Sequence, residues 1–144
     1  MKIERFDDAK HRNHVITLWK SVFGYPDRRN EPDLVISKKI EIDDQLYVAV
    51  VAEQVIGTIM TGYDGHRGWI YSLAVLPEYR KIGIGSQLLK HAEESLTEMG
   101  CMKINLQIMN ENAAVKAFYK KNGYEVEERI SMGKQINANV PSEK

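Results

Sequence analysis

A glycine-containing turn combines the residue types that bind a phosphorylated ligand. It reads Arg80-Lys81-Ile82-Gly83-Ile84-Gly85-Ser86 and follows the apolar run 69–76. The two glycines let the backbone approach a ligand closely, and a helix that begins here offers unpaired N–H groups and the positive end of its dipole. Arg80 and Lys81 add positive charge at the same place. The stretch therefore predicts a phosphate site, with the hydroxyl of Ser86 as a further contact.

The spacing of this turn separates it from two common phosphate-binding motifs. A Walker loop needs Gly-x-x-x-x-Gly-Lys-Ser/Thr and a Rossmann turn needs Gly-x-Gly-x-x-Gly, and the turn matches neither. Arg80-x-x-Gly83-x-Gly85 instead resembles the pyrophosphate loop of the GNAT superfamily of N-acetyltransferases, which bind acetyl-coenzyme A (acetyl-CoA). The resemblance implies that acetyl-CoA is held by the turn, through Arg80, Lys81, Ile82, Gly83, Ile84, Gly85 and Ser86.

The resemblance also assigns a role to the strand before the turn and to a second motif. The backbone of Leu73, Ala74 and Val75 is expected to hold the pantetheine arm and to polarise the thioester carbonyl. Residues 112–124 carry an Asn, Ala, Tyr and Gly-aromatic pattern similar to the C-terminal end of the GNAT core. This similarity implies that Asn112 bonds the pantetheine arm and that Tyr119 faces the thioester sulfur.

The chemistry of acetyl transfer explains why a tyrosine suits position 119. A phenol with a reference pKa near ~10 is protonated at neutral pH and can donate its proton to a departing thiolate of reference pKa near ~8.5. Phenylalanine could not do this. Tyr119 is therefore the predicted catalytic residue, and the alternative is that it is only a core aromatic residue.

A general base is missing from the expected positions. Family members often place Glu or His on the third core strand or the following one, where this chain has Trp69, Tyr71 and Gln107. Gln107 stands where RimI-like protein acetyltransferases carry a glutamate, while the turn 62–68 resembles that of YpeA-like small bacterial acetyltransferases. Removal of the amine proton is left to ordered water, to a carboxylate at 31 or 33, or to a histidine. The predicted substrate contacts are Tyr71, Gln107, His66 and Glu31.

Patterns of apolar residues predict the elements that position these residues. Helices are expected after Asp7, after Glu31, from Ile84 and from Asn110 or Asn112, and the apolar positions of the second are Leu34, Val35, Ile40 and Ile42. Strands are expected at 2–6, 46–52, 55–63, 69–75, 103–108, 124–128 and 131–134. The order β-α-α-β-β-β-α-β-α-β-β indicates an α/β protein of the GNAT fold, with a mixed, mostly antiparallel central sheet flanked by helices. One domain is expected over 1–136, followed by a disordered tail over 137–144.

Composition limits the partners and the compartment. The chain has 144 residues, with 20 Lys and Arg against 20 Asp and Glu, and this zero net charge argues against a nucleic-acid or membrane surface. The single cysteine, Cys101, allows no intramolecular disulfide and no zinc site, so no metal is expected. The N-terminus, charged and polar from Lys2 to His14, has no apolar core of the kind a signal peptide needs, and no apolar stretch approaches the roughly 18 residues of a membrane span. The expected location is the cytoplasm.

These observations predict an acetyl-CoA-dependent N-acetyltransferase. The acetyl group would move to a primary amine by direct attack, without a covalent enzyme intermediate. The acceptor is open between a small molecule and a protein or peptide amine, and the protein is a monomer or a homodimer. The alternative from another class is a CoA-binding regulatory or interaction module without turnover, which the missing base favours slightly and Tyr119 disfavours.

Overall fold

The computed structural model describes residues 1–24 and 27–136. Residues 25–26 and 137–144 lie outside the described part, and with them the tail that was expected to be disordered. Contacts between residues divide the chain into two compact units, Met1–Asn105 and Leu106–Lys144. The single domain expected over 1–136 stays a prediction.

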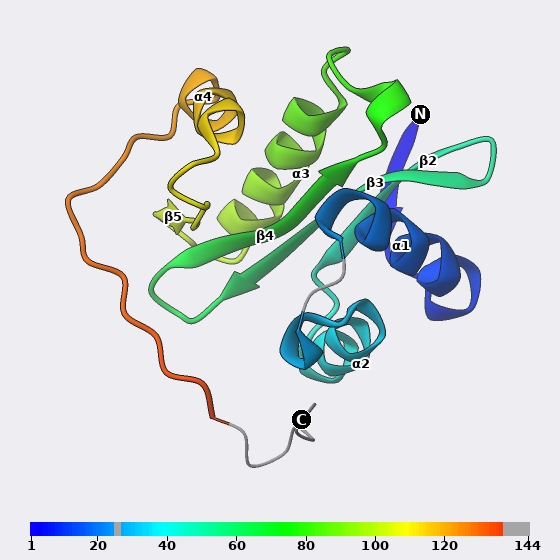
Figure 1. Ribbon diagram of the computed structural model, residues 1–144, viewed down its shortest axis with the longest axis horizontal. Helices are drawn as coiled ribbons and strands as arrows, with labels where there is room; N and C mark the ends of the chain where they lie inside the picture. Colours follow the sequence, from blue (N-terminus) through cyan, green and yellow to red (C-terminus); the bar gives the residue numbers. More distant parts are fainter. Residues whose placement is uncertain (25–26, 137–144) are drawn as a thin grey trace. The chain divides into compact units, whose positions relative to one another are not determined.

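The first unit is built around a five-stranded sheet whose strands lie in sequence order (Figure 1). Its strands are β1 (Lys2–Arg5), β2 (Leu46–Val51), β3 (Gln54–Tyr63), β4 (Gly68–Val75) and β5 (Ile104–Asn105). Strands β1 to β4 pair in antiparallel fashion, and β5 adds to β4 in parallel. The predicted mixed, mostly antiparallel sheet is confirmed.

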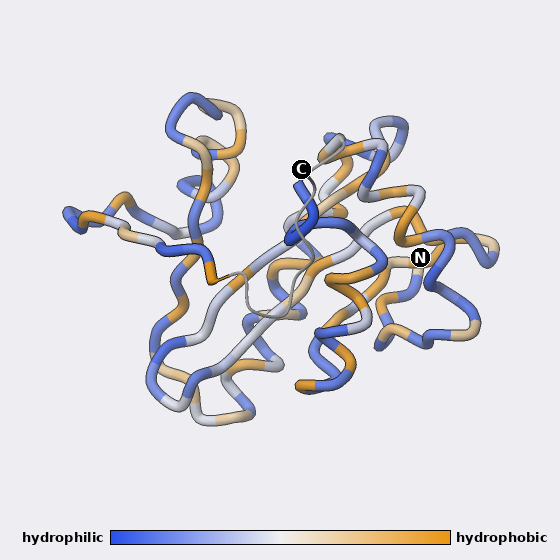
Figure 2. The backbone as a smooth tube through the Cα atoms, turned by 60° about the horizontal axis from the view of Figure 1, so that its bottom comes forward, coloured by the Kyte–Doolittle hydropathy of each residue, from blue (hydrophilic) through white to orange (hydrophobic). Residues whose placement is uncertain are grey.

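Helices cover both faces of this sheet. Figure 1 shows α1 (Asp8–Phe23) and α2 (Pro32–Ile42) on one face and α3 (Ile84–Glu98) on the other. Side chains alternate along a strand, so Leu46 and Val48 of β2 join the core beneath α1 and α2. Tyr47, between them, reaches α3, where its Oη lies 2.6 Å from Oγ of Ser95. The colour of the tube in Figure 2 alternates along the helices between hydrophobic and hydrophilic residues, as expected for amphipathic helices packed on a sheet.

Local signals set the start of α1, as predicted, and the end of α3. The side chain of Asp7 accepts a 3.1 Å hydrogen bond from the backbone N–H of Lys10 and caps α1. Gly100 follows α3 with a φ of 91°, a left-handed conformation that glycine adopts without strain. The chain then turns toward β5.

The buried face of α2 differs from the predicted one. Ile36 is fully buried, whereas Ile40 and Ile42 are 42% and 79% exposed. The first half of α2 is fastened to α1, because Arg12 donates hydrogen bonds to Asp33 and Ser37. The stripe that includes Val35 and Ile36 therefore reaches the core, and the apolar side chains at the C-terminal end of α2 stay at the surface.

The second unit has one helix among its described residues, α4 (Ala113–Lys121). The hairpin predicted from 124–128 and 131–134 is wrong, because the described residues 124–136 form no strand. Its two central residues, Arg129 and Ile130, are not of the types that favour a tight turn, and a two-stranded hairpin alone is marginally stable in water. The predicted strand 103–108 is shorter than expected, since only Ile104 and Asn105 pair with β4.

Candidate active site

The turn between β4 and α3 has the backbone geometry of an anion site. After the short 3₁₀ helix η2 (Pro77–Tyr79), Lys81 and Gly83 adopt left-handed φ values of 67° and 90° and turn the chain into α3. Gly83 is the N-cap residue, and no side chain of the described residues caps the first turn. The first N–H groups of α3 are therefore available to a ligand at the positive end of the helix dipole. The first turn contains no acidic residue, which would compete with an anion.

The turn itself carries two cationic side chains, Arg80 and Lys81. The Nε of Arg80 donates a 2.9 Å hydrogen bond to the carbonyl oxygen of Val75, which ties the turn to the end of β4. Arg80, Lys81 and Ile82 are exposed. The turn therefore offers uncapped N–H groups and positive charge together, as phosphate binding requires.

Strand β4 has a bulge just before the residues predicted to hold the pantetheine arm. Thr58 of β3 pairs with Ala74, but Met60, two residues on, pairs with Tyr71, so β4 has one extra residue here. Ser72 lies in this stretch with a φ of 48°. A bulge leaves the extra residue unpaired and bends the strand.

The other edge of β4 is paired over a short length only. Gly68 and Trp69 pair with β5, and no strand of the described residues pairs with that edge beyond Trp69. The N–H and C=O groups of 70–75 on this edge are therefore not used by a ladder. Leu73, Ala74 and Val75 belong to this stretch, which agrees with a backbone role toward a ligand.

A buried hydrogen-bond chain holds the bulge from the side of α1. The indole Nε1 of Trp19 donates to Oγ1 of Thr58 at 2.8 Å, and this hydroxyl donates to the carbonyl oxygen of Ser72 at 2.9 Å. Thr58 is fully buried and Trp19 is 4% exposed. Helical spacing alone predicts only a core position for Trp19. The sequence signal that could have predicted this network is the threonine at 58 in an otherwise apolar strand, because the N–H of a buried indole needs a hydrogen-bond acceptor.

A cleft of about 450 Å³ opens over the bulge on the side of α1 and α2. This volume is within the range of roughly 300–1,000 Å³ that is common for small-molecule sites. The lining combines apolar side chains with several polar and cationic ones: Trp19, Phe23, Gly24, Arg29, Asn30, Pro32, Val35, Lys38, Lys39, Ile42, Met60, Tyr71 and Ser72. Ser72 joins the cleft to β4, so the cleft meets the strand directly before the predicted pantetheine residues.

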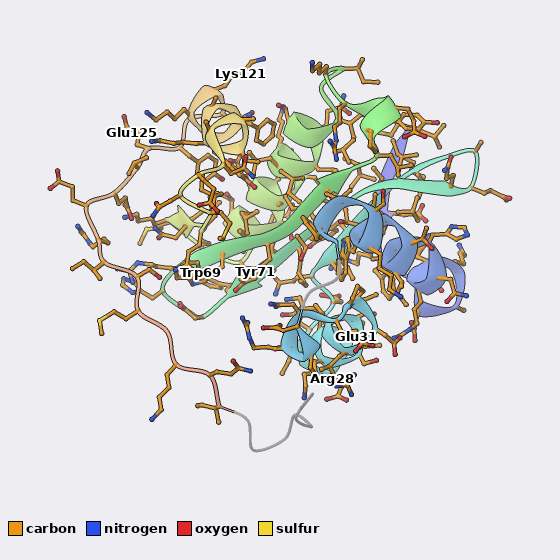
Figure 3. The ribbon with its side chains drawn as sticks, in the orientation of Figure 1. Arg28, Glu31, Trp69, Tyr71, Lys121 and Glu125 are labelled. Carbon is orange, nitrogen blue, oxygen red and sulfur yellow. The ribbon has the colours of Figure 1, made fainter. Side chains whose placement is uncertain are left out.

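Tyr71 is the one predicted substrate contact that lines this cleft. It comes from β4, where Figure 3 labels it together with Trp69, and its side chain is 44% exposed. A Cβ atom on Gly62 would lie 3.2 Å from Oη of Tyr71, so the ring lies over this glycine. Burial, with a smaller effect of the Asp43 charge, raises the pKa of Tyr71. The phenol is therefore a neutral hydrogen-bond donor at pH 7.

The acidic and histidine candidates for proton removal lie outside the cleft lining. The carboxylate of Glu31 pairs with Arg28 at 2.7 Å at the start of α2, where Figure 3 labels both residues. Asp33 pairs with Arg12 of α1. His66 lies in the β3–β4 turn, where its backbone N–H donates to Asp64 at 2.8 Å. Among the described residues that line the cleft there is no Asp, Glu or His.

The second unit holds the predicted catalytic tyrosine. Tyr119 is 8% exposed, and its ring meets those of Phe118 and Tyr124 edge to face, with centroids 5.1 Å and 5.6 Å away. Burial raises the pKa of Tyr119 to about 12. Its phenol therefore keeps its proton at every pH at which the protein would normally be assayed, as a proton donor must.

Two further predicted contacts belong to the second unit. The side chain of Asn112 accepts a 3.2 Å hydrogen bond from the backbone N–H of Val115 and caps α4. The Nε2 of Gln107 donates to Oγ of Ser131. The roles of Asn112, Tyr119 and Gln107 toward acetyl-CoA and the acceptor stay predictions.

The described residues form neither a metal-binding cluster nor a membrane-spanning helix. No group of three or more His, Cys, Asp or Glu side chains in this part of the chain could hold a metal ion. No helix among the same residues is long and apolar enough to cross a membrane.

Known proteins resemble this chain in sequence and in fold. Residues 12–124 match the acetyltransferase (GNAT) family. An acetyltransferase of Sodalis glossinidius (strain morsitans) is 40% identical over 138 residues, which cover 94% of each chain. An aminoglycoside N-acetyltransferase, AAC(6')-Iy, solved in complex with CoA, has a TM-score of 0.76 at 20% identity over 93% of each chain. The PaiA N-acetyltransferase of Thermoplasma acidophilum, also solved with CoA, has a TM-score of 0.73 at 23% identity and covers 90% of this chain and 94% of its own.

These relatives are acetyltransferases, and two of the solved neighbours hold CoA. The chain belongs to the acetyltransferase (GNAT) family. The resemblance seen in residues 80–86 and 112–124 is confirmed, and so are the enzyme class, an N-acetyltransferase, and acetyl-CoA as the acetyl donor.

Proposed function

We propose that the chain binds acetyl-CoA at the β4–α3 turn and transfers its acetyl group to a primary amine held in the cleft beside Tyr71. The observation that carries this proposal is the uncapped N-terminus of α3 at Gly83, which follows β4 after the short helix η2. A pyrophosphate at this turn lets the pantetheine arm run along residues 73–75. The thioester then arrives at Ser72, where the strand meets the cleft.

The reaction is a direct displacement. The amine nitrogen attacks the thioester carbon, a C–N bond forms and the C–S bond breaks. Backbone groups of β4 at the bulge stabilise the charge that develops on the carbonyl oxygen. The thiolate leaves and takes the phenolic proton of Tyr119, while water takes the proton that the amine loses. Water has this role because no carboxylate or imidazole of the described residues lines the cleft.

The class of acceptor that we propose follows from the size of the cleft. The AAC(6')-Iy neighbour is named as an aminoglycoside N-acetyltransferase, but at 20% identity the likeness shows the fold alone. The cleft lies within the first unit and has a volume of about 450 Å³, which suits a small amine. We place the reaction in the cytoplasm, because Cys101 is a buried free thiol.

The test separates binding from turnover. Calorimetry with acetyl-CoA, CoA and ATP measures which carrier binds, and thiol release in the presence of a panel of amines measures transfer. We expect acetyl-CoA to bind, ATP to bind far more weakly, and at least one primary amine to be acetylated. Binding without turnover on any amine would indicate a CoA-binding module instead, and absence of acetyl-CoA binding would overturn the proposed site.

A further inference from the structure

The cleft of the first unit has cations in its lining and no anions. Three lining side chains are cationic, Arg29, Lys38 and Lys39, and none of the described lining residues is Asp or Glu. Apolar side chains form much of the remaining wall, and two of them, Phe23 and Ile42, are 50% and 79% exposed. A ligand that combines an apolar body with an acidic group matches this lining.

Two of the three cations have no ionic partner among the described residues. The Nζ of Lys39 lies 2.8 Å from a carboxylate oxygen of Asp43 and also donates to the carbonyl oxygen of Thr61. Arg29 and Lys38 are exposed and form no ion pair with any described residue. The cleft therefore has an excess of positive charge.

Three carboxylates close to these cations in sequence, those of Asp27, Glu31 and Asp33, are engaged elsewhere. Glu31 pairs with Arg28 at 2.7 Å, and Asp33 pairs with Arg12 at 2.8 Å. Asp27 caps the 3₁₀ helix η1 (Arg28–Asn30) by accepting from the backbone N–H of Asn30. At the corner of η1 and α2, which Figure 3 marks with Arg28 and Glu31, the unneutralised charges are those of Arg29 and Lys38.

We infer that the acceptor is a small primary amine that also carries an anionic group, a carboxylate or a phosphate, and that this group binds Arg29 and Lys38. The inference rests on the proposed function, since it names the acceptor class of the same cleft. The apolar wall then packs against the body of the acceptor, and the amine faces Tyr71 and the bulge. A polycationic acceptor would bring further positive charge to two unneutralised cations, which disfavours its binding.

Matched acceptors test this inference. The acidic acceptor para-aminomethylbenzoate and its neutral counterpart para-aminomethylbenzamide share the same amine and ring, so their amines have similar basicity. The corresponding phosphonate separates a preference for carboxylate from one for a phosphate-like group, and spermidine represents a polycation. We expect kcat/KM of the wild type to be higher for an acidic acceptor than for the amide by about tenfold or more, as for a charge-assisted contact.

Variants then connect this preference to the two cations. Arg29→Gln combined with Lys38→Gln should reduce the ratio of acidic to neutral kcat/KM toward one. Lys90→Gln on α3 removes a charge outside the cleft lining and should leave the ratio unchanged. Acetyl-CoA affinity, measured for each variant, shows that the protein is folded and that the donor site is intact.

The outcomes for the inference and for the proposed function are distinct. If the kcat/KM of the wild type for the amide or for spermidine equals that for the acidic acceptors, the inference is overturned and the acetyltransferase proposal still stands. An unchanged ratio of acidic to neutral kcat/KM in the Arg29→Gln, Lys38→Gln double variant would also overturn the inference. Lack of turnover with every amine, together with acetyl-CoA binding, would instead count against the proposed function.

Discussion

The indole Nε1 of Trp19 donates a 2.8 Å hydrogen bond to Oγ1 of Thr58 inside the core of the first unit. The same hydroxyl donates to the carbonyl oxygen of Ser72, which has a φ of 48° at the β4 bulge. Helix α1 is thereby connected through β3 to the backbone that borders the cleft. The position of the bulge therefore depends on Thr58, a fully buried side chain that does not line the cleft.

Thr58→Val keeps the shape of the side chain and removes the hydroxyl. We expect a loss of about 1–3 kcal/mol in unfolding free energy, because the indole N–H and the Ser72 carbonyl lose a buried partner. We also expect kcat to fall, because the bulge is no longer held. The matched control is Thr61→Val on the same strand, since its fully buried hydroxyl donates to Gln45 and not to β4. Equal kcat in the two variants, by thiol release, would contradict a positioning role for Thr58.

The β4–α3 turn should lose acetyl-CoA when negative charge or bulk is introduced. Gly85→Glu places a carboxylate in the first turn of α3 and should abolish measurable binding by calorimetry. Arg80→Ala removes a charge-assisted contact of about 1.5–3 kcal/mol. Gln54→Glu adds the same charge as Gly85→Glu at the exposed first residue of β3 and serves as the control. Wild-type affinity in a folded Gly85→Glu variant would show that the pyrophosphate binds elsewhere.

Tyr119→Phe should separate binding from chemistry. We expect acetyl-CoA affinity to stay within a few-fold, while the chemical step slows by about 10²–10⁴, the range for a lost general acid. Single-turnover kinetics measures that step directly. Tyr124→Phe removes a phenol from the ring that Tyr119 contacts and controls for changes in packing. A wild-type chemical step in Tyr119→Phe would make this tyrosine a packing residue only.

Activity should rise with pH well beyond neutrality. No base lines the cleft among the described residues, so the rate follows the fraction of free amine, which is about one part in a thousand at pH 7 for an amine with a pKa near ~10. The proton donor is active in its protonated form, so its loss would make the rate fall as pH rises through its pKa. Since burial raises the pKa of Tyr119 to about 12, this fall in rate occurs at a higher pH than the reference pKa of a phenol.

The measurement is kcat/KM against pH for two acceptors of different basicity. The rise should shift to lower pH for the less basic amine, by the difference between the two amine pKa values. Glu31→Gln, Asp33→Asn and His66→Gln should leave the profile in place. If the rise stays near the same pH for both amines and one of these substitutions removes it, a residue of the enzyme is the base.

Gly62→Ala should disturb the acceptor side of the cleft. The new Cβ would lie 3.2 Å from Oη of Tyr71, so the ring has to move. We expect KM for the amine to rise several-fold and acetyl-CoA affinity to stay unchanged. Gly133→Ala, where a Cβ would have no neighbour within 4 Å among the described residues, is the control. An unchanged KM for the amine in Gly62→Ala would argue that Tyr71 does not contact the acceptor.

Local sequence patterns predict the features that depend on neighbouring residues. The caps at Asp7 and Asn112, the strands 46–51, 54–63 and 68–75, and the left-handed Gly83 follow from local patterns, because each involves residues within one turn or one strand. The family could also be predicted from local motifs, since the turn 80–86 and the stretch 112–124 are each continuous in sequence. Local patterns misjudged α2, because the burial of Ile36 depends on distant partners. They also misjudged 124–134, where the described residues form no strand and Arg129 and Ile130 do not favour a tight turn.

The construction of the cleft depends on contacts between residues that are distant in sequence. The hydrogen bond from Trp19 to Thr58 joins residues 39 positions apart, and no local pattern contains it. The charge of the cleft depends equally on packing, because Lys39 pairs with Asp43 while Arg29 and Lys38 do not pair with any described residue. Charge neutrality of the whole chain, read from composition, conceals this local excess. Side chains from α1, α2, β3 and β4 meet there because the sheet and its two helices pack against each other, which is a property of the folded chain.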